Sequence, residues 1–305
     1  MVTPFNYSKN AFGGTEYMGR GWESLISASV PKFKDYLSVI IPGVVPETDK
    51  LINSPVKIII WMHNTPEQFG ENELKILNDP RLINNIKYVI VPSKEHKRLT
   101  LIQIPSMPED KIVVIPNAIA PLKYNLNKFN NINKVKLINT SSPDRGLHIL
   151  LNAVPLIKED FELDIFSRFN PYEYPGYTPD PRINFYGFSF KNTVLKHYES
   201  SHIHAYPSTY PETFCISQAE AMSAGLLCVT SDIGALPEVS GGHTNIYPYI
   251  DDPVKHTEIF AEQITKVIQQ IKAKEWDPTE QIEYINKTYS WEAVKEKWIE
   301  FHELL

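Results

Sequence analysis

The sequence predicts an α/β protein of two domains, each built around a parallel sheet. Short apolar runs alternate along the chain with segments whose apolar residues recur at helical spacing, which is typical of parallel-sheet α/β domains. The length of 305 residues exceeds the roughly 100–200 residues of one domain, so we expect two cores.

The first half of the chain contains four apolar runs that are expected to be strands. A helix is expected at Tyr17–Ile26, after a pair of glycines, and another at Lys94–Leu101, where Ser93 is well placed as the capping residue. The expected strands are Leu37–Ile41, Lys57–Met62, Lys87–Val91 and Lys111–Ile115.

A polar segment rich in Asn and Lys, Lys123–Lys134, is interpreted as the hinge region, because domain boundaries fall where apolar contacts are few. A second α/β pattern follows. Gly225 ends an expected helix at Ile216–Ala224 and suits the left-handed position there. The other expected helices are Gly146–Ile157, Thr257–Lys272 and Trp291–Leu305, and the expected strands are Val135–Asn139, Phe161–Phe166, Arg182–Tyr186, His202–Tyr206 and Leu226–Thr230.

Charge and cysteine content narrow the possible function classes. The chain carries 30 basic and 36 acidic side chains, a formal charge of −6. Nucleic-acid binding needs clustered positive charge, so no nucleic-acid partner is expected. Cys215 and Cys228 are the only cysteines and cannot form a disulfide framework, which favours a reducing, cytoplasmic location. No run reaches the roughly 18 apolar residues of a membrane span.

Two glutamates, Glu212 and Glu220, are the first candidates for a functional site. Glu212 precedes the helix expected at Ile216–Ala224, where free backbone N–H groups gather, and Glu220 lies about two turns inside it. Carboxylates at these two points suit the hydroxyls of an extended sugar ligand. The spacing alone favours a simpler interpretation, in which one acid starts the helix and the other is a solvated charge.

The residues around these glutamates resemble a known family. From Tyr210 to Glu238 the chain has an acid, a Phe-Cys loop, Glu-Ala-Met, a small-residue turn into a strand, a glycine-containing loop and Pro-Glu. This order resembles the E-x7-E region of family 4 glycosyltransferases, and Asn139–Leu147 resembles their phosphate loop. The resemblance is specific over Lys134–Val239. It implies the GT-B fold, in which two Rossmann-like domains face each other across a cleft.

The resemblance also implies how the domains are divided. We expect an acceptor-side domain at 1–120, with the helix 291–305 packing back on it, and a nucleotide-sugar-binding domain at 121–290. Family members typically begin with a full strand before a Gly-Gly loop, whereas here only Met1–Phe5 stand in its place. We therefore expect a reduced N-terminal domain.

Carried over position by position, the resemblance implies roles in a donor site. Glu220 would accept hydrogen bonds from the donor ribose, and Glu212 would contact the transferred sugar as a catalytic residue. Arg145 stands where the family has a basic residue before glycine, usually Lys, and would bind the diphosphate. The alternative for Arg145 is a surface charge at the helix entry, although a cation there opposes the helix dipole. Neighbouring donor-binding positions are Thr213, Phe214, Cys215 and Ile216.

Cys215 departs from the family pattern, which usually has glycine there, so the approach of the backbone to the sugar is expected to differ. Its thiol is expected to be buried and inert, because nothing basic adjoins it in sequence. Near the donor base the resemblance implies Gly187 and Phe188, although core packing explains the aromatic residues equally well. Arg168 would be a second phosphate ligand.

The first half carries weaker matches. Gly13 and Gly14 resemble the family's Gly-Gly loop, and they precede a helix whose N-terminus favours anions, although such a pair is usually only a turn. His63 ends an expected strand where the family often places a histidine in the cleft, and would be catalytic. A structural loop histidine is the alternative. Asn117 is interpreted as a structural hinge residue.

The implied reaction is retaining transfer, of a hexose by default, from a nucleotide diphosphate sugar, with UDP as the first choice of nucleotide and GDP as the second. No Asp-x-Asp motif occurs, so no metal is expected, and no cofactor either. The acceptor stays open among a glycan, a small molecule and a lipid-linked molecule reached by peripheral membrane contact. The oligomeric state is also open.

Other classes of protein were weighed against this one. A nucleotide-sugar-binding protein of the same fold would bind the donor without transferring sugar. A nicotinamide-dependent dehydrogenase would need G-x-G-x-x-G after its first strand, and neither half has it. A nucleotide-sugar epimerase shares the architecture, but the segment around Glu212 and Glu220 resembles transferases more closely.

Overall fold

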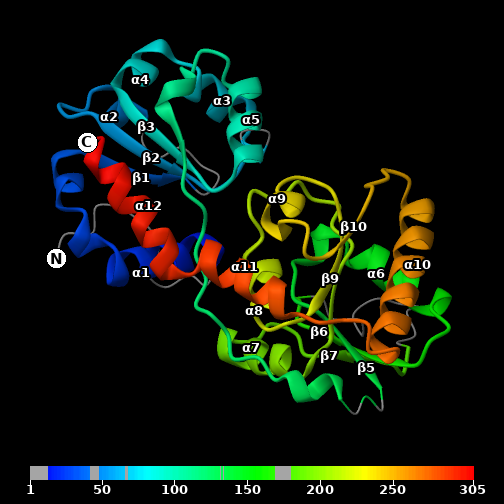
Figure 1. The fold of residues 1–305 in the computed structure, drawn as a ribbon. Coiled ribbons are helices and arrows are strands. Elements are labelled where there is room, and N and C mark those ends of the chain that lie inside the picture. Colours follow the sequence, from blue (N-terminus) through cyan, green and yellow to red (C-terminus); the bar gives the residue numbers. More distant parts are fainter. Residues whose placement is uncertain (1–12, 42–47, 66–67, 131, 133, 169–179) are drawn as a thin grey trace. The chain divides into compact units, whose positions relative to one another are not determined.

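The computed structural model describes residues 13–41, 48–65, 68–130, 132, 134–168 and 180–305. Contacts within the chain divide it into two compact units. The first unit comprises Met1–Ile119 and Thr288–Leu305, and the second comprises Ala120–Lys287. Each unit holds one parallel sheet with helices packed around it (Figure 1).

The sheet of the first unit has the order β1-β2-β3-β4, and every pairing is parallel. All residues of β2 are buried, as expected for an isoleucine-rich strand covered on both faces. The strands are β1 Leu37–Ile41, β2 Ile58–Met62, β3 Ile86–Val91 and β4 Ile112–Val114, and the helices are α1 Gly14–Leu25, α2 Thr48–Ile52, α3 Glu71–Leu77, α4 Pro80–Asn85, α5 Lys94–Gln103 and α12 Trp291–Glu303.

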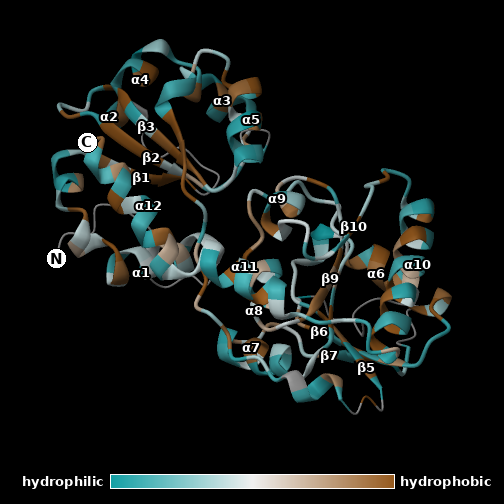
Figure 2. Ribbon diagram, in the orientation of Figure 1, coloured by the Kyte–Doolittle hydropathy of each residue, from teal (hydrophilic) through white to brown (hydrophobic). Residues whose placement is uncertain are grey.

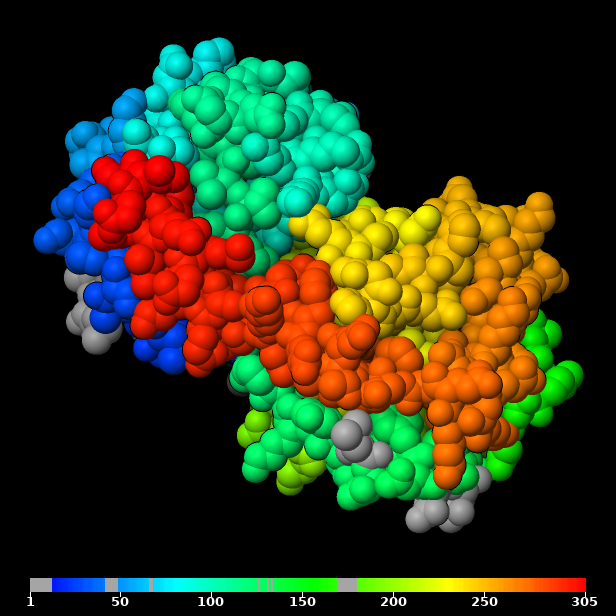
Figure 3. Space-filling model, in the orientation of Figure 1, coloured from blue at the N-terminus to red at the C-terminus, as the bar shows by residue number. Residues whose placement is uncertain are grey.

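The C-terminal helix α12 belongs to the core of the first unit. The Trp298 ring makes edge contacts with Trp22 of α1, at 5.7 Å between centroids, and with Trp61 of β2, at 5.0 Å. It also lies 5.8 Å from the ring of Phe33. Figure 3 shows this helix, in red, against the blue segments near the N-terminus. Helices α1 and α12, which lie far apart in the sequence, therefore pack in the same core.

The sheet of the second unit has the order β10-β9-β8-β5-β6-β7, again with parallel pairings throughout. After β5, the chain adds β6 and β7 on one side of that strand and then crosses to β8 on its other side. The strand order therefore reverses between β5 and β8. The strands are β5 Val135–Asn139, β6 Phe161–Ile165, β7 Ile183–Phe185, β8 Ile203–Tyr206, β9 Leu227–Ser231 and β10 Asn245–Tyr247, and the helices are α6 Leu147–Ala153, α7 Lys191–Ser200, α8 Ile216–Ser223, α9 Leu236–Ser240, α10 Pro253–Lys272 and α11 Thr279–Tyr289.

Each unit has its own apolar core. In Figure 2 the buried strands are brown, whereas the exposed helix faces are largely teal. The longest helix, α10, buries one apolar face that includes Phe260, Ile264 and Ile268. This division follows the alternation of apolar strands and amphipathic helices in the sequence. None of the helices within the described ranges is long and apolar enough to cross a membrane.

The predicted α/β class with parallel sheets is confirmed, and every predicted strand is present within one or two residues. Ser93 caps α5, because its side chain accepts a hydrogen bond of 3.0 Å from the backbone N–H of His96. Gly225 has the expected left-handed conformation, with φ of 77°. Several helices were not predicted from the sequence, namely α2, α3, α4, α7, α9 and α11.

The hinge interpretation of Lys123–Lys134 needs correction, because this segment lies inside the second unit. Nζ of Lys128 donates hydrogen bonds to the carbonyl oxygens of Ala224, at 3.0 Å, and Tyr198, at 3.4 Å. Burial lowers the pKa of Lys128 to about 7. The aliphatic stem of a lysine can be buried while its ammonium group satisfies the free carbonyls of helix ends. The polar composition of Lys123–Lys134 therefore does not mark a boundary between the two units.

Candidate functional site

The candidate site lies in the second unit, where the strand order reverses between β5 and β8. In open parallel sheets, ligands bind outside the carboxyl ends of the strands at such a switch point. The loop after β5 carries Arg145 and the loop after β8 carries Glu212. Gly146 has φ of 109°, and a Cβ atom there would overlap the carbonyl oxygen of Pro207. A glycine is therefore needed for the two loops to approach each other.

Arg145 and Glu212 form the central contact of the site. Nη1 of Arg145 donates to Oε1 of Glu212 at 2.8 Å, and the hydroxyl of Tyr206 donates to the same oxygen at 2.5 Å. The guanidinium carbon lies 4.2 Å from the centroid of the Tyr210 ring. The carboxylate of Glu212 is thus held by a cation and a hydroxyl although its side chain is only 8% exposed. Arg145 is consequently not the isolated surface charge of the simpler interpretation.

The surroundings of Arg145 favour its charged form. Burial disfavours the charged form of Arg145, but Glu212, Tyr206 and Tyr210 outweigh that effect and raise its pKa. The pKa of Tyr206 is raised well above its usual value, chiefly by burial and also by the charge of Glu212. The Tyr206 hydroxyl therefore stays a hydrogen-bond donor across the physiological pH range. Neither Tyr206 nor Tyr210 was predicted as a site residue, although Tyr206 ends a predicted strand next to the predicted acid.

The loop after β9 supports Glu212 from the other side. The backbone N–H of Ala235 donates to the carbonyl oxygen of Glu212 at 2.8 Å. A Cβ atom on Gly234, which has φ of 63°, would lie 2.5 Å from the backbone nitrogen of Glu212. The backbone of Glu212 is therefore fixed by a neighbouring loop that only glycine allows to approach so closely.

The segment from Glu212 to α8 is buried and conformationally unusual. Phe214 is 1% exposed and Cys215 is 7% exposed. Cys215 has φ of 78° and stands directly before Ile216, the first residue of α8. Burial raises the pKa of its thiol to about 12, which agrees with the expectation of a buried and inert cysteine. Thr213 completes this segment at intermediate exposure.

Glu220 is not a solvated helix charge. It lies on α8 with a side chain that is 9% exposed, and its Oε1 forms an ion pair with Nζ of Lys191, the first residue of α7. Burial raises the pKa of Glu220, and Lys191 opposes this rise. Lys191 was missed from the sequence because its helix was not predicted.

Gly187 and Phe188 lie in the turn between β7 and α7. Gly187 has φ of 64°, and no atom lies within 4 Å of the position of a Cβ there. Phe188 is 55% exposed, so core packing does not account for it. The guanidinium carbon of Arg168 lies 5.3 Å from the Phe188 ring. Tyr186, by contrast, stacks on Phe166 with centroids 4.7 Å apart.

The remaining predicted residues lie in the first unit. Gly13 precedes α1 and Gly14 is its first residue. His63 follows β2, is 7% exposed, and has its ring 4.8 Å from that of Trp61. Burial lowers the pKa of His63 to about 3, with a smaller contribution from His96.

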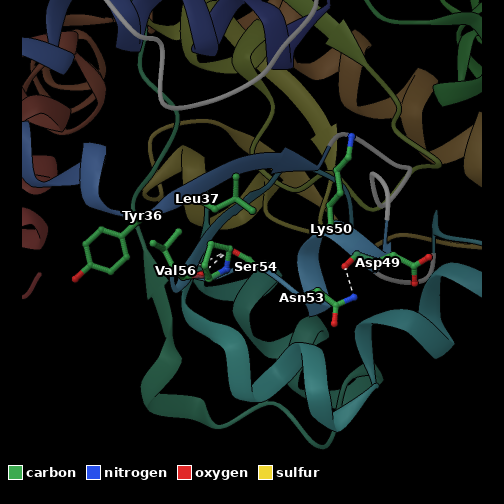
Figure 4. A pocket seen from close by; sticks show the side chains of 8 residues that line it. Tyr36, Leu37, Asp49, Lys50, Asn53, Ser54 and Val56 are labelled. Atoms are coloured by element: carbon green, nitrogen blue, oxygen red, sulfur yellow. Dashed lines mark hydrogen bonds between the residues drawn. The ribbon is translucent and has the colours of Figure 1, made fainter.

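A separate open hollow of about 570 Å³ lies in the first unit (Figure 4). It is lined by Tyr36, Leu37, Asp49, Lys50 and the residues Asn53, Ser54, Pro55 and Val56. Leu37 is the first residue of β1, so the hollow lies at the amino end of that strand. His63 lies beyond the carboxyl end of β2, which is the opposite edge of the sheet. The hollow contains none of the predicted site residues.

The chemistry available in the second unit is that of paired charges and backbone amides. Two buried carboxylates, Glu212 and Glu220, are each matched by a cation from another element, Arg145 and Lys191. Over the described ranges, no group of three or more His, Cys, Asp or Glu side chains has the arrangement of a metal site. The arrangement can offer cations to an anionic ligand and carboxylates to its hydroxyls.

Comparison with known proteins bears on this part of the chain. Residues 136–270 match the family of glycosyl transferases, group 1. An uncharacterized glycosyltransferase of Methanocaldococcus jannaschii, MJ1607, is 24% identical over 241 residues, which are 71% of this chain and 60% of the relative. The chain therefore spans about 60% of the length of this curated relative.

Two solved structures illustrate the likeness in fold. Anabaena Alr3699/HepE in complex with UDP-glucose has a TM-score of 0.68 at 15% identity, covering 89% of this chain and 79% of that one. The pneumococcal O-GlcNAc transferase GtfA in complex with UDP and GlcNAc has a TM-score of 0.69 at 16% identity, covering 88% and 56%. These likenesses confirm the predicted GT-B fold class with two Rossmann-like domains.

Proposed function

We propose that this chain is a retaining glycosyltransferase that moves a sugar, of hexose type, from a UDP- or GDP-sugar to a hydroxyl acceptor. The observation that carries the proposal is the Arg145–Glu212 pair at the switch point of the second sheet, 2.8 Å between Nη1 and Oε1. It lies within the segment that matches group 1 glycosyl transferases. A cation next to a buried carboxylate suits a ligand that carries both phosphates and sugar hydroxyls.

The nucleotide part of the donor would bind to the second unit. Arg145 would bind the diphosphate, and Glu220 would accept hydrogen bonds from the ribose. The exposed Phe188 beside Gly187 would provide an aromatic surface next to the base. The backbone amides of Thr213, Phe214 and Cys215, just before α8, and of Ile216, its first residue, would complete the diphosphate site, because the N-terminus of a helix favours anions.

Glu212 would contact the transferred sugar, with His63 as a second catalytic residue and Gly13 and Gly14 at the phosphates. The bond from the anomeric carbon to the diphosphate would break, leaving an oxocarbenium-like sugar. The acceptor hydroxyl would attack from the same face and give its proton to the departing diphosphate. Arg145 would stabilise the charge that develops on the leaving diphosphate. Such stabilisation is effective because the charged group is already fixed in place. We propose that no metal ion or other cofactor is needed for this step.

The donor base and the acceptor are proposed by class. UDP is our first choice, and two relatives of the same fold support it because their structures contain UDP-glucose or UDP. GDP is the second choice. The acceptor would be a glycan, a small molecule or a lipid-linked molecule reached by peripheral membrane contact. We propose a cytoplasmic location, which the free, buried thiols of Cys215 and Cys228 support.

Calorimetry with UDP, GDP, ADP, their common sugar conjugates and NAD tests the donor site. We expect one nucleoside diphosphate to bind at micromolar strength and Glu220→Ala to weaken that binding by about 1–3 kcal/mol. Binding of NAD alone, or of no compound, would contradict the proposal. Anomeric NMR of the product on a defined acceptor tests retention, and an inverted product would remove that part. Donor binding without turnover on any acceptor would instead indicate a nucleotide-sugar-binding protein.

A further inference from the structure

A second cation lies at the buried carboxylate of Glu220. Nζ of Lys191, at the start of α7, forms an ion pair with Oε1 of Glu220, on α8. The Glu220 side chain is 9% exposed and that of Lys191 is 37% exposed. The pair therefore joins two helices of the second unit, with its acid inside and its base near the surface.

The position of Lys191 in its helix is unfavourable without this partner. The first turn of a helix presents free N–H groups and the positive end of the helix dipole, so a cation there is repelled. No acidic residue occupies the first turn of α7. The ion pair with Glu220 offsets this repulsion. Glu220 is also one of the two buried carboxylates of the candidate site.

Glu220 depends on a neighbouring cation for its charge. Burial raises the pKa of its carboxyl group, and Lys191 lowers it through both charge and a hydrogen bond. Tyr198, also on α7, stays neutral, because burial and then the charge of Glu220 raise its pKa well above its usual value. Its hydroxyl lies 2.8 Å from Oγ1 of Thr140. Lys191 is thus the charged group that offsets the burial of Glu220.

We propose that Lys191 is a positioning residue of the donor site, which fixes the Glu220 carboxylate as an anion that selects a ribose over a 2′-deoxyribose. The inference rests on the proposed function, because it takes Glu220 as the ribose ligand. Lys191 engages Oε1, and the ribose hydroxyls donate to Oε2. A hydrogen bond to an ionised acceptor is about twice as strong as one to a neutral acceptor. Without Lys191, the loss of one ribose hydroxyl therefore costs less affinity.

The test compares Lys191→Met with Lys196→Met in the full chain. Methionine keeps most of the length of the lysine stem but carries no charge. Lys196 is an exposed lysine of the same helix and serves as the matched control. Calorimetry at pH 6 and pH 8 would measure the dissociation constants of UDP, GDP and their 2′-deoxy counterparts.

For the wild type and Lys196→Met, we expect the preferred ribonucleotide to bind at least about tenfold more tightly than its 2′-deoxy form. In Lys191→Met this ratio should fall to about threefold or less, because a partly protonated Glu220 is a weaker acceptor. Affinity for the ribonucleotide should fall more at pH 6 than at pH 8, because burial raises the pKa of Glu220 and Lys191 no longer opposes this rise. Lys191→Arg should restore the ratio, because it restores the cation.

The outcomes separate this inference from the proposed function. A Lys191→Met protein that keeps the wild-type ratio at both pH values overturns the role of Lys191 and leaves the proposed function standing. A wild type that binds none of the four nucleotides overturns both. Circular dichroism checks that each variant is folded, and Lys191→Gln replaces the methionine variant if that one does not fold. A reduced ratio that arginine fails to restore also overturns the proposal.

Discussion

The guanidinium group of Arg145 and the carboxylate of Glu212 lie 2.8 Å apart, although 67 positions separate them in the sequence. The contact joins the loop after β5 to the loop after β8. Both groups were assigned to different parts of a donor, the diphosphate and the sugar. Their direct pairing indicates that a donor would have to replace part of this contact as it binds, so the two residues should affect binding in opposite ways.

Replacing Arg145 should weaken nucleotide binding. Arg145→Ala removes the cation expected at the diphosphate, and we expect the binding of UDP or GDP to weaken by about 1–3 kcal/mol. Arg145→Lys should lose less, because lysine keeps the charge but not the planar fork of the guanidinium group. Calorimetry measures the affinities of these variants for UDP and GDP, and Arg98→Ala, on the exposed face of α5, is the control. Equal affinities of a folded Arg145→Ala variant and the wild type would refute the assignment.

Replacing Glu212 should have a different effect on binding and on turnover. Glu212→Gln keeps the side-chain shape and an oxygen for the Tyr206 hydroxyl, but it removes the negative charge next to Arg145. We expect nucleotide affinity to be unchanged or higher, because the charge of Arg145 is no longer neutralised. Turnover should fall by about 10²-fold or more if the carboxylate acts on the sugar in the transition state. Single-turnover assays and calorimetry measure the two effects, and wild-type turnover would exclude a catalytic role.

The fold could be predicted from the sequence because the strands are continuous apolar runs. Ile58–Met62, for example, is buried at every position, and so short a run rich in β-branched residues favours a buried strand over a helix. The helix α4 was missed although Asp79 caps it and Pro80 is its first residue. That combination is a recognised start signal for a helix. A short helix of six residues offers too little periodicity to be found in any other way.

The candidate site could be predicted only in part, because its pairs join distant segments. Glu212 and Arg145 were found through a resemblance in local motifs, whereas Lys191 lies in a helix whose sequence gives no such motif. Spacing alone also favoured the wrong environment for Glu220, since a glutamate inside a helix is usually solvated. Glu220 is buried because α7 packs against it, and the sequence around Glu220 does not show this contact.

Cys215 is expected to carry backbone strain, because it has φ of 78° where glycine is favoured. Comparing Cys215→Gly with Cys215→Ala isolates this strain, since both variants remove the sulfur. We expect the glycine variant to be more stable than the alanine variant by about 1 kcal/mol. Urea unfolding followed by circular dichroism measures the difference. An alanine variant of equal or greater stability would show that the backbone relaxes without cost.

His63 should make the first unit sensitive to acid. Its pKa is lowered to about 3 by burial, whereas an unfolded histidine has a pKa of about 6.5. The unfolded state therefore binds the proton first, and the free energy of unfolding should fall by up to about 1.4 kcal/mol per pH unit as the pH drops from about 6.5 towards 3. His63→Gln should reduce this dependence, because it removes one of the buried histidines of the first unit. Tryptophan fluorescence in urea at pH 4.5–7 measures the free energy of unfolding of the first unit, where the Trp61 ring lies 4.8 Å from His63.

His96→Gln should reduce the slope as well, because burial lowers the pKa of His96 to about 4. Slopes that match the wild type in both variants would mean that these histidines take up protons in the folded state.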